Sequence, residues 1–175
     1  MHQAIAARFE GSGFPPLAAL AIWRQLIGAS THLESPLNIT ALAPYPEHLW
    51  LAREYFGVQV GLTSAPSLSE ALAQLASGCS NILLLPLPTS HACWQQAEQI
   101  KASGLSIFAQ LPVVASNLPA GMHAALALAA VTPEASGDDV SYHLHHGTLT
   151  TRDGFHPEGE GLFLGAHPRP ISIGA

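Results

Sequence analysis

Charged residues are scarce in this chain. Aspartate, glutamate, lysine and arginine make up 10% of the 175 residues, whereas they form roughly a quarter of an average soluble domain. The formal net charge is −6 and the six lysine and arginine residues are scattered, so we expect no basic surface and no nucleic acid partner. Apolar residues reach 48%, which predicts that another subunit or domain covers part of the exterior.

Cysteines and long apolar runs are also rare. The chain has two cysteines, Cys79 and Cys93, too few and too loosely spaced for a disulfide framework or a zinc site. No apolar run approaches the roughly 20 residues that span a bilayer. Residues 1–13 lack the basic and apolar regions of a signal peptide. We therefore expect a cytoplasmic protein with reduced cysteines, no metal, no cofactor and no membrane association.

The segment from Pro15 to Pro36 predicts one amphipathic helix. Pro15 and Pro16 suit a first helical turn, where a missing N–H costs nothing, and Pro36 ends the helix. Apolar residues recur at steps of three and four and predict one buried face: Leu20, Trp23 and Ile27, together with Ala19, Leu26, Ala29 and Leu33. Because this face is wide, we expect a homodimer that forms through the N-terminal helix.

The same helix resembles the third helix of the all-helical chorismate mutases, which reads roughly W-R-x-[IL]-I-x-x-S-x-x-x-[QE]. The matching residues are Trp23, Arg24, Leu26, Ile27, Ser30 and Glu34. The resemblance implies that the Ser30 hydroxyl binds a carboxylate and that Glu34 faces the ether oxygen of chorismate, with Arg24 beside them. That family also needs cationic residues from two earlier helices, and residues 1–14 are too short to form them. The other interpretation of Ser30 and Glu34 is a solvated or partner-facing surface.

Strand and helix patterns alternate three times after Pro36. Strands are predicted at 37–43, 58–63 and 81–88, and helices at 46–57, 67–78 and 91–104. Ser67 and Glu70 have the spacing of a capping box, and the continuous apolar run from 81 to 88 is typical of a strand buried on both faces. This alternation predicts a parallel sheet with helices on its faces.

From Leu105 onwards the pattern changes to strands separated by turns, without a convincing helix. Strand signals occupy residues 105–114, 122–132, 140–146, 148–155 and 159–166. We expect them to extend the same sheet as antiparallel strands. The sequence therefore predicts an α/β fold with a mixed sheet and an N-terminal helix, organised as a helical arm (residues 1–35) and one α/β domain (residues 36–175).

Residues 37–170 resemble the C-terminal extension of certain bacterial chorismate mutases. That extension is distantly similar to prephenate dehydratases, which share the fold of type 2 periplasmic binding proteins. The best local matches are LPLPTS (85–90), PEASGDD (133–139) and LGAHPRP (164–170). Where a dehydratase has Thr-Arg-Phe, this chain has His123, Ala124 and Ala125. It lacks the guanidinium that would clamp a substrate carboxylate, so we expect no dehydratase activity.

Three further groups of residues suggest sites. Thr89 and Ser90 follow a buried strand and begin a helix, where they would contact a ligand or cap the helix. His143 and His145 share one face of a strand, as metal ligands or as surface residues. Asp138 and Asp139 follow a glycine, where they would bind turn N–H groups or a cation. The turn and the surface interpretations are favoured for the last two groups.

The sequence therefore predicts a degenerate ligand-binding or regulatory module related to chorismate mutase and prephenate dehydratase, without catalysis of its own. Such a module either binds an aromatic acid or only scaffolds a dimer through its N-terminal helix. The alternative is a chorismate mutase, converting chorismate to prephenate, in which Arg24, Ser30 and Glu34 are completed by a separate helical segment.

Overall fold

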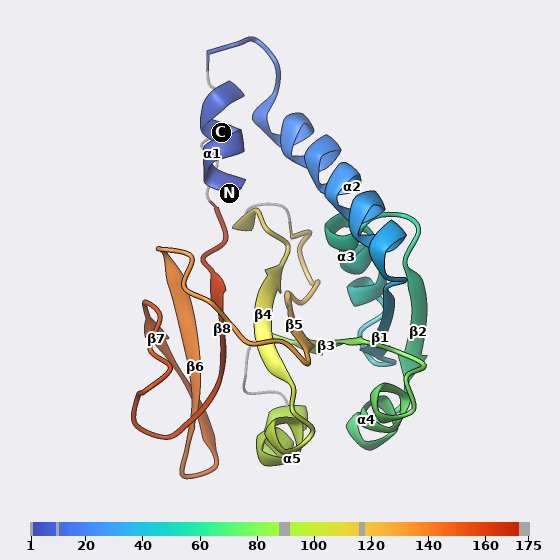
Figure 1. The fold of residues 1–175 in the computed structure, drawn as a ribbon, viewed down its shortest axis with the longest axis vertical. Helices are drawn as coiled ribbons and strands as arrows, with labels where there is room; N and C mark the ends of the chain where they lie inside the picture. The colour runs from blue at the N-terminus through green and yellow to red at the C-terminus, as the bar shows by residue number, and fades with distance from the viewer. Residues whose placement is uncertain (1, 10, 88–91, 116–117, 172–175) are drawn as a thin grey trace.

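Eight strands form one mixed sheet in the computed structural model, which describes residues 2–9, 11–87, 92–115 and 118–171 (Figure 1). The strand order is β2-β1-β3-β5-β4-β8-β6-β7. The strands are β1 (Asn38–Leu42), β2 (Gly61–Ala65), β3 (Ile82–Pro86), β4 (Ser106–Leu111), β5 (Ala125–Ala129), β6 (Asp139–His145), β7 (Thr148–Asp153) and β8 (Leu162–Pro168). The predicted α/β class is confirmed.

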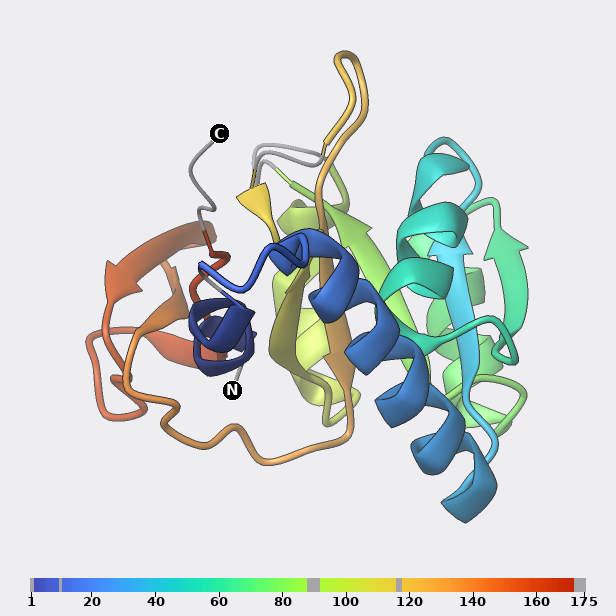
Figure 2. The same ribbon diagram turned by 90° about the horizontal axis from the view of Figure 1, so that it is seen from above.

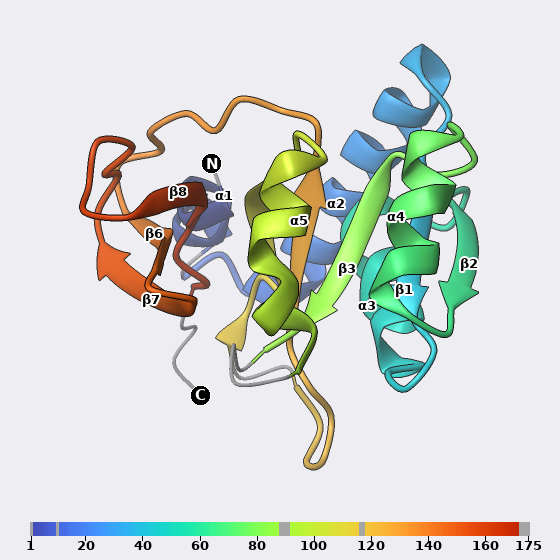
Figure 3. The same ribbon diagram turned by 90° about the horizontal axis from the view of Figure 1, so that it is seen from below.

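The first half of the sheet is parallel and has helices on both faces. β1 pairs in parallel with β2 and with β3. Helix α3 (Glu47–Phe56) covers one face, whereas α4 (Leu68–Ala76) and α5 (Ala97–Ala102) cover the other (Figures 1 and 3). Every residue of β3 is buried, as the continuous apolar run predicts. The Ser67 hydroxyl accepts a hydrogen bond from the backbone N–H of Glu70 (3.3 Å), which confirms the cap of α4.

Several predicted boundaries need correction, including those of β4, β5 and β8, which differ by three residues at one end or both. β2 begins at Gly61 rather than at residue 58, because the chain turns at Gly57 (φ +100°) and uses the next residues to reach the sheet. The helix predicted at 91–104 is a 3₁₀ turn, η1 (Ala92–Gln96), followed by the short helix α5. In the 3₁₀ turn the Trp94 indole is buried, and its Nε1 donates a hydrogen bond to the Pro86 carbonyl (2.8 Å).

The second half of the sheet is mostly antiparallel. β5 runs antiparallel to both β3 and β4, and β6 runs antiparallel to β7 and β8. One pair departs from the prediction, because β4 and β8 are parallel and meet at Ile107 and Gly165. β8 lies between β4 and β6 in the sheet, so it connects the β6–β7 hairpin to β4.

Two helices precede the sheet. Helix α2 (Pro16–Glu34) is confirmed with the predicted limits, whereas α1 (His2–Phe9) was not predicted. Figure 2 shows both on the side of the sheet that α3 covers, with α1 next to the first turns of α2. Among the described residues no helix has the length and apolarity needed to cross a membrane. Cys79 and Cys93 are both free thiols.

The buried face of α2 differs from the predicted one. Its buried residues are Ala19, Leu20, Arg24 and Gly28, whereas Leu26 is 57% and Leu33 is 87% exposed. The cause is Gly28, whose lack of a side chain lets α2 approach the backbone of Phe56 and Gly57 at the end of α3. This close contact fixes the rotation of α2 about its axis, and it turns an apolar face towards solvent.

Candidate functional site

Arg24 is held against the carboxyl end of α3. Its guanidinium carbon lies 3.6 Å from the centre of the Tyr55 ring. Its Nε donates a hydrogen bond to the Tyr55 carbonyl (2.9 Å), and Nη2 donates to the same oxygen. The neighbouring Gln25 donates from Nε2 to the Arg53 carbonyl (3.3 Å). Both side chains thus bind carbonyls in the last turn of α3, although the Arg53 carbonyl also accepts a hydrogen bond from the backbone N–H of Gly57 (3.1 Å).

A cavity of about 420 Å³ lies between α2 and the sheet, and Arg24 forms part of its wall. Three aromatic side chains line it, and so does the end of β5 with the residues that follow: Tyr55, Phe56, Phe108, Ala129, Ala130 and Val131. Thr31 and Asn81 add polar atoms. None of the described residues that line the cavity is an aspartate or a glutamate. We call this space the α2 groove.

The α2 groove contains one fixed positive charge. Burial lowers the pKa of the Arg24 guanidinium from its usual value, but arginine is not deprotonated in proteins at neutral pH. A smaller cavity of about 180 Å³ lies on the other side of Arg24 and includes Glu54, whose pKa burial raises. Glu54 therefore lines the smaller cavity, whereas the α2 groove is lined by Arg24 and by no described acidic residue.

The structure separates the three residues that resemble a chorismate mutase site. Arg24 is buried, whereas Ser30 and Glu34 are both exposed. Six helical residues turn the chain by about 600°, which leaves Ser30 about 120° from Arg24 around the helix. Ser30 and Glu34 share a face, as their spacing predicts, but the Arg24 guanidinium points to Tyr55. Thr89 and Ser90 lie outside the described residues.

A second group of ionisable side chains lies at the carboxyl ends of β1 and β3. His123 Nδ1 and Glu47 Oε1 are 3.1 Å apart, and the backbone N–H of His123 donates to the same oxygen (3.3 Å). Tyr45 stacks on His48 with 5.2 Å between ring centres. β1 connects to β2 on one side and lies next to β3 on the other. Such a switch point is where open α/β sheets commonly bind ligands. We call this group the carboxyl-edge cluster.

Burial of His48 predicts that stability depends on pH. Burial lowers the pKa of the His48 imidazole to about 4, against the attraction of Glu47 and against hydrogen bonds with the backbone of His123 and Ala124. In the unfolded chain the His48 imidazole is protonated near pH 6.5. The stability that comes from keeping it neutral in the folded protein is therefore complete above pH 6.5 and is lost as the pH falls towards 4. We expect a loss of about 3 kcal/mol in the free energy of unfolding over this range.

Urea titrations between pH 7 and 4 test this expectation. The variant His48→Phe should lose clearly less stability over the range than the wild type. His145→Phe is a matched control, because His145 is exposed, and it should keep the wild-type dependence. An unchanged pH dependence in His48→Phe would show that other groups cause it.

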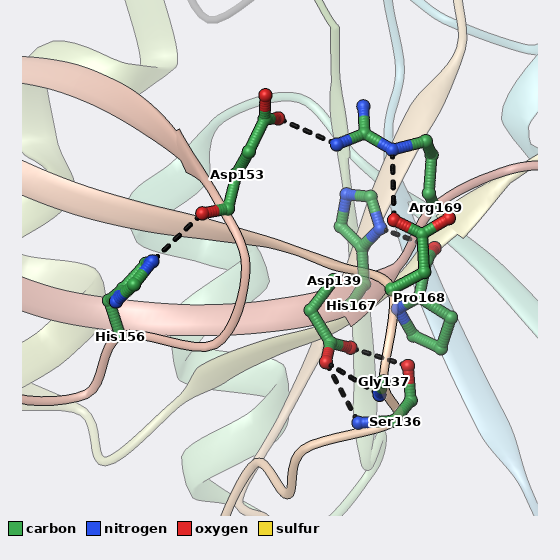
Figure 4. Close-up of polar contacts among 9 residues, drawn as sticks. Ser136, Gly137, Asp139, Asp153, His156, His167, Pro168 and Arg169 are labelled. Carbon is green, nitrogen blue, oxygen red and sulfur yellow. Dashed lines mark hydrogen bonds and ion pairs between the residues drawn. The ribbon is translucent and has the colours of Figure 1, made fainter.

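The predicted turn at residues 136–139 is present (Figure 4). The Asp139 carboxylate accepts hydrogen bonds from the backbone N–H of Ser136 (2.8 Å) and of Gly137 (3.2 Å) and from the Ser136 hydroxyl (2.6 Å). Arg169 joins Asp138 (3.2 Å) to Asp153 (2.6 Å). Asp138 and Asp139 thus fasten this turn to the end of β8.

The histidines of β6 form no metal site with other described residues. His143 is buried against Phe163, with 5.4 Å between ring centres, whereas His145 is exposed. Among the described residues no three histidine, cysteine, aspartate or glutamate side chains are grouped to hold a metal ion.

The sequence matches no protein-family model, and no curated protein matches it. Among solved structures, a chain described as "GqqA- a novel type of quorum quenching acylases" is similar in path, with 11% identity and a TM-score of 0.47. The alignment covers 75% of this chain and 94% of that one. A likeness at this level does not indicate which activity this chain has.

Sequence reasoning singled out Arg24 but missed its surroundings. Tyr55, Phe108 and Val131 join it in the α2 groove only through the folding of distant segments. Glu47 and His123 are 76 residues apart, so no local pattern pairs them. The one local signal was Gly28, a glycine in the middle of a predicted helix, which commonly marks a close packing contact.

Proposed function

We propose that this chain is a non-catalytic binding module that takes an aromatic monocarboxylic acid into the α2 groove. The observation that carries the proposal is a large apolar cavity with a single cation, Arg24, in its wall. Cavities of this size suit small organic ligands, and a few fixed polar groups then orient the ligand. The aromatic walls favour a ring, and the guanidinium favours a carboxylate.

The charges of the α2 groove also predict which acids bind poorly. An amino acid would bring an ammonium group beside Arg24, and the described lining offers no carboxylate to accept it. A dicarboxylate such as prephenate would bring a second negative charge into an apolar space, where burial of an unpaired charge is costly. Phenylpyruvate combines one ring with one carboxylate and fits the groove best. The resemblance to proteins of aromatic amino-acid synthesis suggests it as the first probe.

The alternative function, a chorismate mutase completed by a helical partner, receives less support from the geometry. Ser30 and Glu34 are exposed and available to a partner. Arg24 is buried against Tyr55 and does not share their exposed surface. Such an enzyme would have to take every cation for its two substrate carboxylates from the partner.

A thermal-shift series tests the proposal. Phenylpyruvate and phenylacetate should raise the melting temperature, because a ligand at 100 times its dissociation constant adds about 2.7 kcal/mol, or several degrees in a domain of this size. Phenylacetamide has the same shape without the charge and should give a much smaller shift. Phenylalanine, prephenate and chorismate should also shift it less than phenylpyruvate does.

A pair of matched variants locates the site. Ala130→Phe places a ring in the α2 groove and should abolish the shift, because Ala130 lines the cavity and is exposed. Ala73→Phe makes the same change at an exposed position on α4, on the other side of the sheet, and should preserve the shift. No shift with any acid, or an equal shift with phenylacetamide, would contradict the proposal. An unchanged shift in Ala130→Phe would exclude the groove as the site.

A further inference from the structure

The outer face of α2 carries a row of apolar side chains that nothing in the described structure covers. Ile22, Leu26 and Leu33 are 56%, 57% and 87% exposed, and Ala29 between them is half-buried. Of the eleven large apolar side chains that are exposed in the described part of the chain, six lie between residues 14 and 33. The apolar surface is therefore concentrated on this helix rather than spread over the molecule.

The spacing of these residues fits a helical partner. Ile22, Leu26, Ala29 and Leu33 follow one another at steps of four, three and four, which is the repeat of a helix that packs along a second helix. We call these four residues the α2 seam. Figures 1 and 2 show α1 beside the first turns of α2 only, so most of the seam is open.

Charge favours a second copy of this chain as the partner. The residues that flank the α2 seam are Trp23 and Ser30 on one side and Gln25 and His32 on the other. The exposed Glu34 follows Ser30 on the same side and is the one charged residue among these five, although the chain as a whole carries a net charge of −6. Two copies that meet here avoid the repulsion that their other surfaces would produce. A strongly charged partner would find Glu34 as the one charged side chain beside the seam.

We propose that two copies of this chain associate through their α2 seams, about a two-fold axis. In a two-fold interface both copies contribute the same surface, so each residue of the α2 seam contacts the seam of the other copy. The seam shares Leu26, Ala29 and Leu33 with the face predicted from the sequence, but Ala19 and Leu20 of that face are already packed inside the molecule. The proposal does not depend on ligand binding, since the α2 groove lies on the opposite side of the helix.

Sedimentation velocity from low to high micromolar concentration tests the proposal. The wild type should sediment as a dimer. Leu26→Glu and Leu33→Glu should each weaken association at least about 30-fold, as loss of a central apolar anchor does. Leu162→Glu is the matched control, because Leu162 is an exposed leucine (42%) outside the seam, and it should remain dimeric.

Leu33→Glu also guards against a misleading result. Leu33 is 87% exposed in the single chain, so its replacement should leave the fold intact, which circular dichroism and the melting temperature of the variant test. A wild type that stays monomeric at high micromolar concentration would overturn the proposal. So would a dimer that persists in both seam variants or one that Leu162→Glu disrupts equally.

Discussion

Gly165→Ala should destabilise the protein more than any other single methyl addition discussed here. Gly165 lies in β8 opposite Ile107 of β4, and a Cβ at this position would be 2.3 Å from the Ile107 carbonyl oxygen and 2.4 Å from its nitrogen. Both are backbone atoms within the sheet and cannot move aside. Gly165 also has a φ of +134°, a backbone conformation that residues with a side chain rarely adopt. Overpacking and backbone strain together predict a loss of about 4 kcal/mol.

Urea denaturation of Gly165→Ala measures this loss, and Gly147→Ala provides the comparison. Gly147 also has a positive φ, +77°, but a Cβ there would meet no atom within 4 Å. Gly147→Ala should therefore lower the free energy of unfolding by about 1 kcal/mol, which is the cost of placing a Cβ at a positive φ. Equal losses in the two variants would mean that β8 does not approach β4 as closely as described.

Gly28→Ala should release α2 from α3. A Cβ on Gly28 would lie 2.1 Å from the Phe56 carbonyl oxygen and 2.6 Å from the carbonyl carbon. Alanine favours the helix itself by about 1 kcal/mol, but the clash forces the helices apart and breaks the contact of Arg24 with Tyr55. We expect a net loss of about 2 kcal/mol in the free energy of unfolding.

Hydrogen exchange distinguishes release of the helix from general unfolding. In Gly28→Ala the amides of α2 should exchange faster while those of β3 remain protected. The α2 groove loses one wall at the same time, so the thermal shift with phenylpyruvate should disappear. Ser30→Ala, two positions away and exposed, is the control and should change stability by a few tenths of a kcal/mol. Normal protection of α2 in Gly28→Ala would contradict the proposed role of this contact.

Local sequence patterns predicted the elements of this fold well. The prolines at both ends fixed α2, the Ser67 hydroxyl fixed the start of α4, and the apolar run at 82–86 identified the buried strand β3. Each of these signals depends on residues a few positions apart. The chemistry of a helix end or a buried strand acts over the same short range, which explains the agreement.

The candidate site could not be predicted in the same way. The rotation of α2 depends on the close contact between Gly28 and Phe56 and on the hydrogen bonds of Arg24 to Tyr55, and with this rotation Arg24 faces inwards and Leu26 outwards. The apolar periodicity of α2 predicted a buried face that includes Leu26 and Leu33, but of that face only Ala19 and Leu20 are buried. Arg24 was singled out with Ser30 and Glu34, but a shared helix does not imply a shared face.

The most direct test of the binding function is a titration of the ¹⁵N-labelled protein with phenylpyruvate, followed through its backbone amide signals. Binding in the α2 groove predicts the largest shifts in the residues of α2 and of the end of β5 that line the cavity, which are Ile27, Gly28, Thr31, Ala129, Ala130 and Val131. Largest shifts at Tyr45, Glu47 and His123 would instead place the ligand at the carboxyl-edge cluster and contradict the account. Signals that do not move at millimolar phenylpyruvate would contradict a role in binding this class of acid.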